Sequence, residues 1–292
     1  MFRGTFTALV TPFKGEEIDF GALEKLLDAQ FVAKVDGVVA VGTTWESPTL
    51  LHAERESVIQ KCVQLGKGRC QVLAGTGSYS TRDAVEATKR AEQMGVDGAL
   101  VVSPYYNKPS QEGLFQHFKA IAGATSIPIM LYNIPGRCGV DIGADTVVRL
   151  AGACPNIIAI KEASGSVERV SELRGRLPEA FTILSGDDSL TLPFMAVGAV
   201  GVVSVASNLI PAEICALVAA FTAGDAVTAQ KIHRRILPLI KDLFIEPNPV
   251  PVKTALGWRG LMSSACRLPL CEMSEANQAR LRKTLQAFEQ SK

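Results

Sequence analysis

The stretch Ile157-Ile158-Ala159-Ile160-Lys161 is a run of apolar residues that ends in an amine, and Glu162 follows it. The apolar residues are continuous and do not alternate with polar ones, which is typical of a strand buried on both faces of a parallel sheet. In barrels of parallel strands, the loops after the C-terminal strand ends build the active site. The stretch therefore predicts both a parallel sheet and a reactive amine at its functional edge.

Other short apolar runs of the same kind alternate with longer amphipathic patterns along the chain. Together with residues 157–161, they span residues 5–10, 37–42, 70–75, 99–103, 128–132, 181–185 and 201–205. Strands that alternate with helices in this way favour a closed (β/α)8 TIM barrel. A doubly wound open sheet usually has a glycine-rich phosphate turn after its first strand, whereas this chain has Thr11-Pro12-Phe13-Lys14.

The clearest helical pattern covers residues 81–94, where Thr81 is a candidate N-cap and Gly95 a stop signal. From Pro211 onward the chain has a helical pattern, which is interrupted near Glu246-Pro247-Asn248-Pro249. We expect the α/β barrel to cover residues 1–225 and a small C-terminal helical extension to cover residues 226–292.

Composition limits the classes of partner. The chain has 292 residues with 30 basic and 29 acidic side chains, so its net charge of +1 favours neither nucleic acid nor an anionic membrane as partner. Its seven cysteines are scattered without a C-x-x-C pair, which indicates a reducing, cytoplasmic location. Three distant histidines predict no metal site, and the absence of a long apolar run predicts no signal peptide or membrane span.

Polar and aromatic residues collect at the predicted C-terminal strand ends. All four tyrosines of the chain lie in these segments, which also contain Thr43, Thr44 and Asp188. The relevant tyrosines are Tyr79, Tyr105, Tyr106 and Tyr132. Random placement would put at least one tyrosine on a helix, so the clustering indicates a site.

Lys161 is the sharpest candidate within that cluster. Burial disfavours the ammonium form, so a lysine at the end of an apolar strand retains neutral amine that can attack a ketone and form an imine. The alternative is a strand-end lysine that reaches water or pairs with Glu162.

Phenols near such an amine can donate and accept the protons that imine and enamine chemistry requires. Thr43 can link two phenols through its hydroxyl group. The alternatives are that Tyr105 and Tyr106 pack in a loop or an oligomer interface, and that Tyr132 only fills the core.

Arg137 follows Tyr132-Asn133-Ile134-Pro135-Gly136, a loop stiffened by its proline. A guanidinium group in this position can hold a substrate carboxylate through two hydrogen bonds. A solvated surface arginine is the alternative.

Taken together, these segments closely resemble the dihydrodipicolinate synthase (4-hydroxy-tetrahydrodipicolinate synthase) family, within the wider pyruvate-dependent class I aldolases that include N-acetylneuraminate lyase. The resemblance covers nearly the whole chain and depends on five motifs in the same order. They are Gly42-Thr43-Thr44, Ser103-Pro104-Tyr105-Tyr106-Asn107-Lys108-Pro109, Tyr132-Asn133-Ile134-Pro135 with Arg137, Ile160-Lys161-Glu162-Ala163, and Ser185-Gly186-Asp187-Asp188.

The resemblance implies that Lys161 forms the Schiff base with pyruvate and that no other cofactor is needed. It implies a proton relay of Thr43, Tyr132 and Tyr106, in which Tyr106 reaches the active site of a neighbouring subunit. It further implies a homotetramer built as a dimer of dimers.

Substrate-binding residues are implied in the same way. Thr44 would hold the pyruvate carboxylate, and Gly186 and the backbone of Val203 would line the site. Arg137 would bind the carboxylate of L-aspartate 4-semialdehyde, because the family's synthases have an arginine at this place and its sialic-acid lyases do not. The implied reaction is the condensation of pyruvate with this aldehyde in the diaminopimelate and lysine biosynthesis pathway.

Two alternatives remain from the sequence: another pyruvate-dependent aldolase, such as N-acetylneuraminate lyase or a keto-sugar-acid aldolase, or a catalytically silent barrel. The silent barrel is supported by Trp45 alone, because the family's loop usually reads Gly-Thr-Thr-Gly-Glu-Ser and has glycine there. A tryptophan can narrow the pocket, reshape the loop or turn away from it.

The family's allosteric lysine site lies in a region that differs here. The matching residues are Ser47, Pro48, His52, Arg55, Tyr79, Asp83 and Tyr105. Tyr79 stands where sensitive enzymes commonly have asparagine, and Arg55 stands where they have histidine or glutamate. Because Arg55 adds a positive charge near the inhibitor's ammonium group, we predict weak or absent inhibition by L-lysine.

Overall fold

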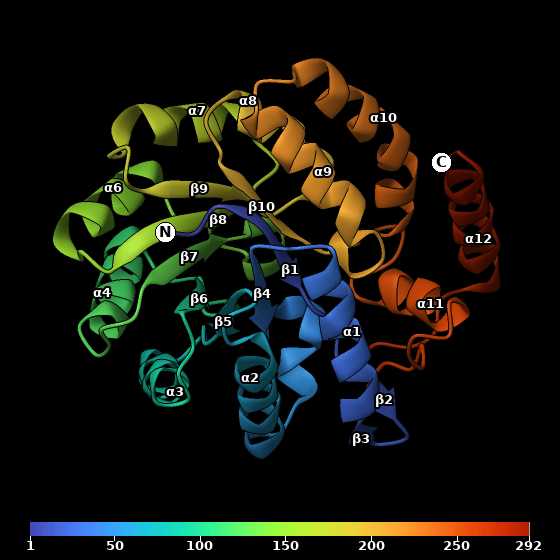
Figure 1. The fold of residues 1–292 in the computed structure, drawn as a ribbon. Coiled ribbons are helices and arrows are strands. Elements are labelled where there is room, and N and C mark those ends of the chain that lie inside the picture. Colours follow the sequence, from blue (N-terminus) through green and yellow to red (C-terminus); the bar gives the residue numbers. More distant parts are fainter. Residues whose placement is uncertain (292) are drawn as a thin grey trace.

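The computed structural model of the protein describes residues 1–291, and its centre is a closed barrel of parallel strands (Figure 1). The barrel strands are β1 (Gly4–Ala8), β4 (Gly37–Ala40), β5 (Gln71–Gly75), β6 (Gly98–Val102), β7 (Ile129–Asn133), β8 (Ile157–Glu162), β9 (Thr182–Ser185) and β10 (Gly201–Ser204). Pairing of β10 with β1 closes the ring. The predicted TIM barrel is confirmed, and every predicted apolar run overlaps one of these strands.

Helices follow the strands and surround the barrel (Figure 1). They are α1 (Phe20–Val32), α2 (His52–Gly66), α3 (Thr81–Gln93), α4 (Gln111–Ala122), α6 (Ala144–Ala153), α7 (Val167–Arg176), α8 (Thr191–Ala196) and α9 (Pro211–Thr222). The N-cap predicted for α3 is wrong by one residue, because the Ser80 side chain accepts the hydrogen bond from the Asp83 backbone. Thr81 is the first helical residue instead.

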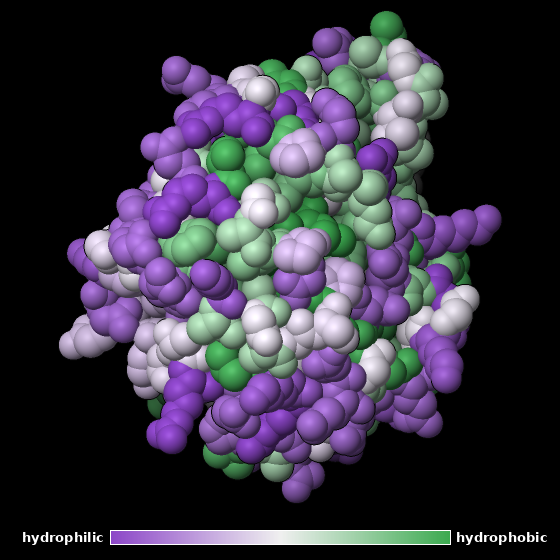
Figure 2. All heavy atoms as spheres, turned by 90° about the vertical axis from the view of Figure 1, so that its left-hand side faces the viewer, coloured by the Kyte–Doolittle hydropathy of each residue, from purple (hydrophilic) through white to green (hydrophobic). Residues whose placement is uncertain are grey.

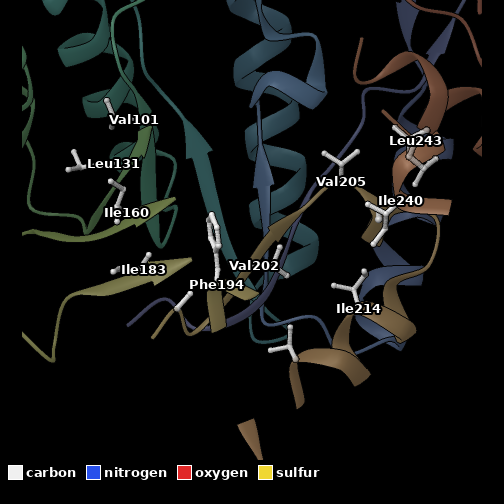
Figure 3. Close-up of a cluster of buried hydrophobic side chains, with 14 of the residues drawn as sticks. Val101, Leu131, Ile160, Ile183, Phe194, Val202, Val205, Ile214, Ile240 and Leu243 are labelled. Carbon is white, nitrogen blue, oxygen red and sulfur yellow. The ribbon is translucent and has the colours of Figure 1, made fainter. Parts of the chain in front are cut away.

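Side chains of each strand alternate between the barrel interior and the layer of helices. In β8, Ala159 belongs to the interior cluster, whereas Ile160 belongs to the outer one. Figure 3 shows the outer cluster, in which Ile160 and Val202 come from strands and Phe194 and Ile214 from helices. Because the strand period is two residues, Lys161 lies on the interior side with Ala159.

Short elements at the strand ends were not predicted. They are a two-stranded sheet of β2 (Phe13–Lys14) and β3 (Glu17–Ile18), the helix α5 (Pro135–Cys138), and the 3-10 turns η1 (Thr43–Trp45), η2 (Ser47–Thr49), η3 (Asp188–Leu190) and η4 (Ala206–Asn208). Most of these turns follow directly after a barrel strand. They place the polar residues of the loops around one end of the barrel.

Beyond α9 the chain forms α10 (Ala226–Asp242), α11 (Val250–Trp258) and α12 (Glu275–Gln290). The predicted interruption near residues 246–249 separates α10 from α11. The predicted boundary between residues 225 and 226 lies in the turn before α10 and stays a prediction. Residues 259–274 contain no helix or strand, and they cross back toward β2 and β3, where Arg267 donates a hydrogen bond to the Glu16 carbonyl.

The outer surface over the left-hand helices of Figure 1 is mixed, with hydrophilic residues around hydrophobic ones (Figure 2). Ion pairs join neighbouring helices, such as Arg149 of α6 with Glu112 of α4 at 2.8 Å. Such exposed pairs contribute little to stability. Among residues 1–291, no helix is long and apolar enough to cross a membrane, and no group of metal-binding side chains is present.

Candidate functional site

Lys161 lies at the C-terminal end of β8 with its side chain inside the barrel, and only 5% of it is exposed. The backbone of Gly186 passes close to it. A Cβ atom at Gly186 would lie 3.0 Å from Lys161 Cε and 2.7 Å from Ala163 Cβ. Glycine at this position therefore leaves the space that the lysine side chain occupies.

Burial of Lys161 has the electrostatic consequence expected from its sequence. Loss of solvation lowers the pKa of Lys161 to about 7, which the nearby Asp188 carboxylate opposes and the Arg137 guanidinium reinforces. A substantial fraction of the amine is therefore neutral, and nucleophilic, near neutral pH.

Tyr132 is the closest aromatic partner of this amine. Tyr132 and Lys161 are paired residues of the adjacent strands β7 and β8, and Lys161 Nζ lies 4.1 Å from the centroid of the Tyr132 ring. Burial raises the pKa of Tyr132 to about 12, although Arg137 and a hydrogen bond with Thr43 act in the opposite direction. The phenol is thus protonated at neutral pH and can donate a proton beside the amine.

The turn after β4 carries Thr43 and Thr44. The side chain of Thr43 hydrogen-bonds Tyr132, and the buried Thr44 Oγ1 accepts a hydrogen bond from Asn248 Nδ2 at 3.0 Å. The two threonines therefore have different partners. Thr43 contacts Tyr132 of the barrel wall, and Thr44 contacts Asn248 of the C-terminal segment.

Arg137 lies in α5, which Pro135 begins, directly after β7. Its Nη2 donates to the Asn248 carbonyl at 3.4 Å, and its charge acts on both Lys161 and Tyr132. Arg137 is exposed to solvent, and its charge nevertheless acts on the site that contains the amine.

Asn248 was missed in the sequence. It contacts both Thr44 and Arg137, and its own Oδ1 is buried without a hydrogen-bond partner within the described residues. The one signal for it was the Pro247-Asn248-Pro249 interruption, which indicates a break between helices and does not indicate where the asparagine points.

Asp188 ends the motif Ser185-Gly186-Asp187-Asp188, and the sequence alone does not indicate its role. Its buried carboxylate accepts hydrogen bonds from Ser204 Oγ, from the Val205 backbone at 2.9 Å and from the Ala206 backbone at 3.2 Å. These bonds hold the ends of β9 and β10 together. They also keep a negative charge near Lys161, where it supports the ammonium form. Val203, which directly precedes these partners in the chain, is fully buried in the interior cluster.

The tyrosines do not all gather around Lys161. Tyr105 packs edge to face against Tyr79, with ring centroids 5.4 Å apart. Tyr106 is 91% exposed, and its backbone adopts a positive φ of 72°. Within one chain, the structure brings Tyr132 to the amine but leaves Tyr106 in solvent.

The residues matched to a regulatory region lie on neighbouring elements. Ser47 and Pro48 form η2, His52 begins α2, and Asp83 is in the first turn of α3. Arg55 Nη2 donates to the Ser47 carbonyl at 2.7 Å and lowers the pKa of Tyr105, although burial raises that pKa more. The positive charge of Arg55 therefore reaches the tyrosine pair.

Trp45 neither narrows the site nor lies in solvent. It is fully buried among side chains between the barrel wall and the helices α1 and α2, and its Nε1 donates to the Val39 carbonyl at 2.7 Å. The indole thus packs away from the barrel interior. Trp45 was the one sequence feature that favoured a catalytically silent barrel, and its position between the barrel wall and the helices explains why it does not obstruct the site.

Comparison with known proteins agrees with this geometry. Residues 1–288 match the model of the Dihydrodipicolinate synthetase family. A 4-hydroxy-tetrahydrodipicolinate synthase of Endomicrobium trichonymphae is 52% identical over 288 residues, which are 99% of each chain. The structure of a 4-hydroxy-tetrahydrodipicolinate synthase from Methylacidiphilum fumariolicum SolV has a TM-score of 0.98 and 53% identity, and covers 99% of this chain and 97% of its own.

A crystal structure of dihydrodipicolinate synthase from Aquifex aeolicus is also similar, with a TM-score of 0.97, 49% identity and coverage of 99% and 98% of the two chains. Identity and coverage of this extent establish common descent along the whole chain. This protein belongs to the Dihydrodipicolinate synthetase family.

Proposed function

We propose that this chain is a Schiff-base synthase that condenses pyruvate with L-aspartate 4-semialdehyde to 4-hydroxy-tetrahydrodipicolinate, in diaminopimelate and lysine biosynthesis. The observation that carries the proposal is the buried Lys161 amine, whose pKa is lowered to about 7 beside Tyr132. The name shared by its relatives supports the choice of substrates.

In this reaction the neutral amine of Lys161 attacks the ketone carbon of pyruvate, and loss of water gives an imine. Tyr132 donates the proton that the departing hydroxyl group needs. The imine then loses a methyl proton to give an enamine, whose carbon attacks the aldehyde carbon, and the new alkoxide takes up a proton. The amine of the semialdehyde unit finally attacks the imine carbon and releases Lys161 as the ring closes.

Substrate carboxylates are held by groups that surround the amine. Thr44, Gly186 and the backbone of Val203 bind the pyruvate part, and Arg137 binds the carboxylate of the semialdehyde through paired hydrogen bonds. The covalent link to Lys161 takes the place of an external cofactor.

Borohydride reduction in the presence of pyruvate tests the proposal directly. Reduction is expected to add the mass of one reduced pyruvate to the peptide that contains Lys161, and the Lys161→Ala variant is expected to gain none. Steady-state rates then separate the substrates: turnover with aspartate semialdehyde is expected, and turnover with N-acetylmannosamine instead would contradict the assignment. Failure of the wild-type chain to trap pyruvate would remove the enzyme proposal altogether.

Tyr106 completes the relay of Thr43 and Tyr132 from a second copy of the chain, within a homotetramer. Its high exposure in one chain supports this role, because a phenol in solvent has no task at its own site. Mixed assemblies test the arrangement. Lys161→Ala and Tyr106→Phe chains, each of low activity, are expected to regain activity when co-expressed, because one site then receives both intact groups. Absence of complementation would place Tyr106 at its own chain's site or outside catalysis.

A further inference from the structure

Glu46 and Lys253 form an ion pair that is fully removed from solvent. Both side chains are 0% exposed, and Lys253 Nζ lies 2.5 Å from Glu46 Oε1. The other carboxylate oxygen of Glu46 accepts a hydrogen bond from the Arg267 backbone at 2.9 Å. The pair therefore joins the turn after β4 to α11 and to the segment that follows α11.

Such a pair is a poor way to stabilise a fold. Removing two charges from water costs nearly as much as their attraction returns, and apolar replacements of similar size are often neutral or stabilising. A buried pair at this place is better explained by the geometry that it imposes on its surroundings.

The geometry concerned is that of the turn itself. Glu46 has left-handed backbone angles, φ 56° and ψ 36°, which are unfavourable for a residue with a side chain. Its backbone N–H donates to the Thr43 carbonyl at 3.0 Å, so the strained residue closes the turn that presents Thr43 and Thr44. The carboxylate bonded to Lys253 holds this conformation from the other side.

Further contacts hold Lys253 beside the turn. Lys253 Nζ lies 4.4 Å from the centroid of the Phe13 ring, and the Arg267 guanidinium lies 4.5 Å from the same centroid. Arg267 also binds both carboxylate oxygens of Glu54, at 2.7 and 2.6 Å. Lys253 and Arg267 thus both lie over the Phe13 ring, beside the turn that contains Glu46.

We propose that Glu46 and Lys253 are positioning residues, whose buried ion pair orients Thr43 toward Tyr132 and Thr44 toward the pyruvate carboxylate. This inference rests on the proposed function, because it assigns the threonines to that reaction. It predicts that the pair matters more for turnover than for stability.

The double variant Glu46→Gln/Lys253→Met tests the inference by removing both charges together. The thermal midpoint is expected to change little, whereas kcat falls on the order of 10- to 100-fold because reacting groups are misplaced. The KM for pyruvate is expected to rise more than the KM for the semialdehyde, since Thr44 is in the displaced turn and Arg137 is not. A double variant with wild-type kcat and KM would overturn the inference.

A matched control is the pair Asp242 and Arg280, which joins α10 to α12 at 2.7 Å without touching the turn. Asp242→Asn/Arg280→Met is expected to keep wild-type kcat. An equal loss in this control would mean that any loosening of the C-terminal helices is sufficient, and would also overturn the inference.

Glu46→Asp provides a second test if the double variant does not fold. It keeps the charge but shortens the side chain by one methylene, so the turn must shift to keep the ion pair. The expected result is a folded protein that still traps pyruvate on Lys161 with lowered kcat, and unchanged kcat would contradict the proposal. Failure of the wild-type chain to trap pyruvate would instead refute the underlying reaction, so the two failures are distinguishable.

Discussion

The two halves of the site are built differently. Lys161 and Tyr132 lie on adjacent barrel strands, where strand pairing fixes their positions. Thr43 and Thr44 lie on a short turn whose partners include Asn248 and Lys253, more than 200 residues away in sequence. Lys161 and Tyr132 thus depend on the barrel wall, whereas Thr43 and Thr44 depend on contacts with the C-terminal segment.

The largest expected effect comes from Lys161→Ala, which changes the half of the site that is built on the barrel strands (the strand half). Activity is expected to disappear and no pyruvate adduct to form, because no other amine takes part in the site. Steady-state assays measure the activity, and mass analysis after borohydride reduction measures the adduct. Lys231→Ala, on the exposed surface of α10, is the matched control and is expected to keep full activity.

Tyr132→Phe keeps the ring packed against Lys161 and removes only the hydroxyl group. We expect kcat to fall on the order of 10²- to 10⁴-fold, as for a positioned acid–base group, with little change in KM for pyruvate. A variant that turned over at the wild-type rate would leave Tyr132 as a packing residue of the core.

The pH dependence of imine formation also reports on the strand half. Because burial lowers the pKa of Lys161 to about 7, the neutral fraction of its amine increases as pH rises toward that value and levels off above it. The rate of reductive trapping at limiting pyruvate is therefore expected to rise about tenfold per pH unit below the pKa, a gradient that applies to any single titrating base. A rate that continued to rise to the pKa of an exposed lysine would contradict the burial of this amine.

Asn248→Ala tests the half assembled over long range. It removes the donor to Thr44 Oγ1, and we expect the KM for pyruvate to rise about tenfold, the effect of a single hydrogen bond of about 1.4 kcal/mol. Reductive trapping at saturating pyruvate should remain complete, since Lys161 is untouched. Loss of trapping as well would mean that the two halves are not separable.

The smallest expected effect concerns L-lysine. The Arg55 guanidinium lies near Tyr105 and repels a second positive charge, so inhibition by L-lysine is expected to be weak or absent. Rates measured across a range of L-lysine concentrations check this prediction. A sub-millimolar inhibition constant would show that other contacts outweigh the repulsion.

The barrel and its reactive lysine could be predicted from the sequence because both are local signals. Each strand is a short apolar run, and Lys161 ends one of them. The alternation of side chains in a strand then places that lysine inside the barrel.

Asn248 and the ion pair of Glu46 with Lys253 could not be predicted in this way. Their roles arise from contacts between distant parts of the chain, which leave no periodic pattern. A buried lysine and glutamate also contradict the usual preference of charged residues for the surface. The position of Lys253 within an apolar helix therefore did not indicate that it pairs with Glu46. The orientation of Trp45 was equally open, because it depends on the packing of α1 and α2 against the barrel wall.

The chain order of these contacts has a consequence for synthesis on the ribosome. The amine and its phenol emerge long before α11, so a growing chain that has completed the barrel strands still has the Glu46 carboxylate without Lys253. Asn248 reaches Thr44 across 204 residues of sequence, and Arg267 reaches Glu46 across 221. A nascent chain therefore completes the contacts of the turn that carries Thr43 and Thr44 only after α11 and Arg267 have been synthesised.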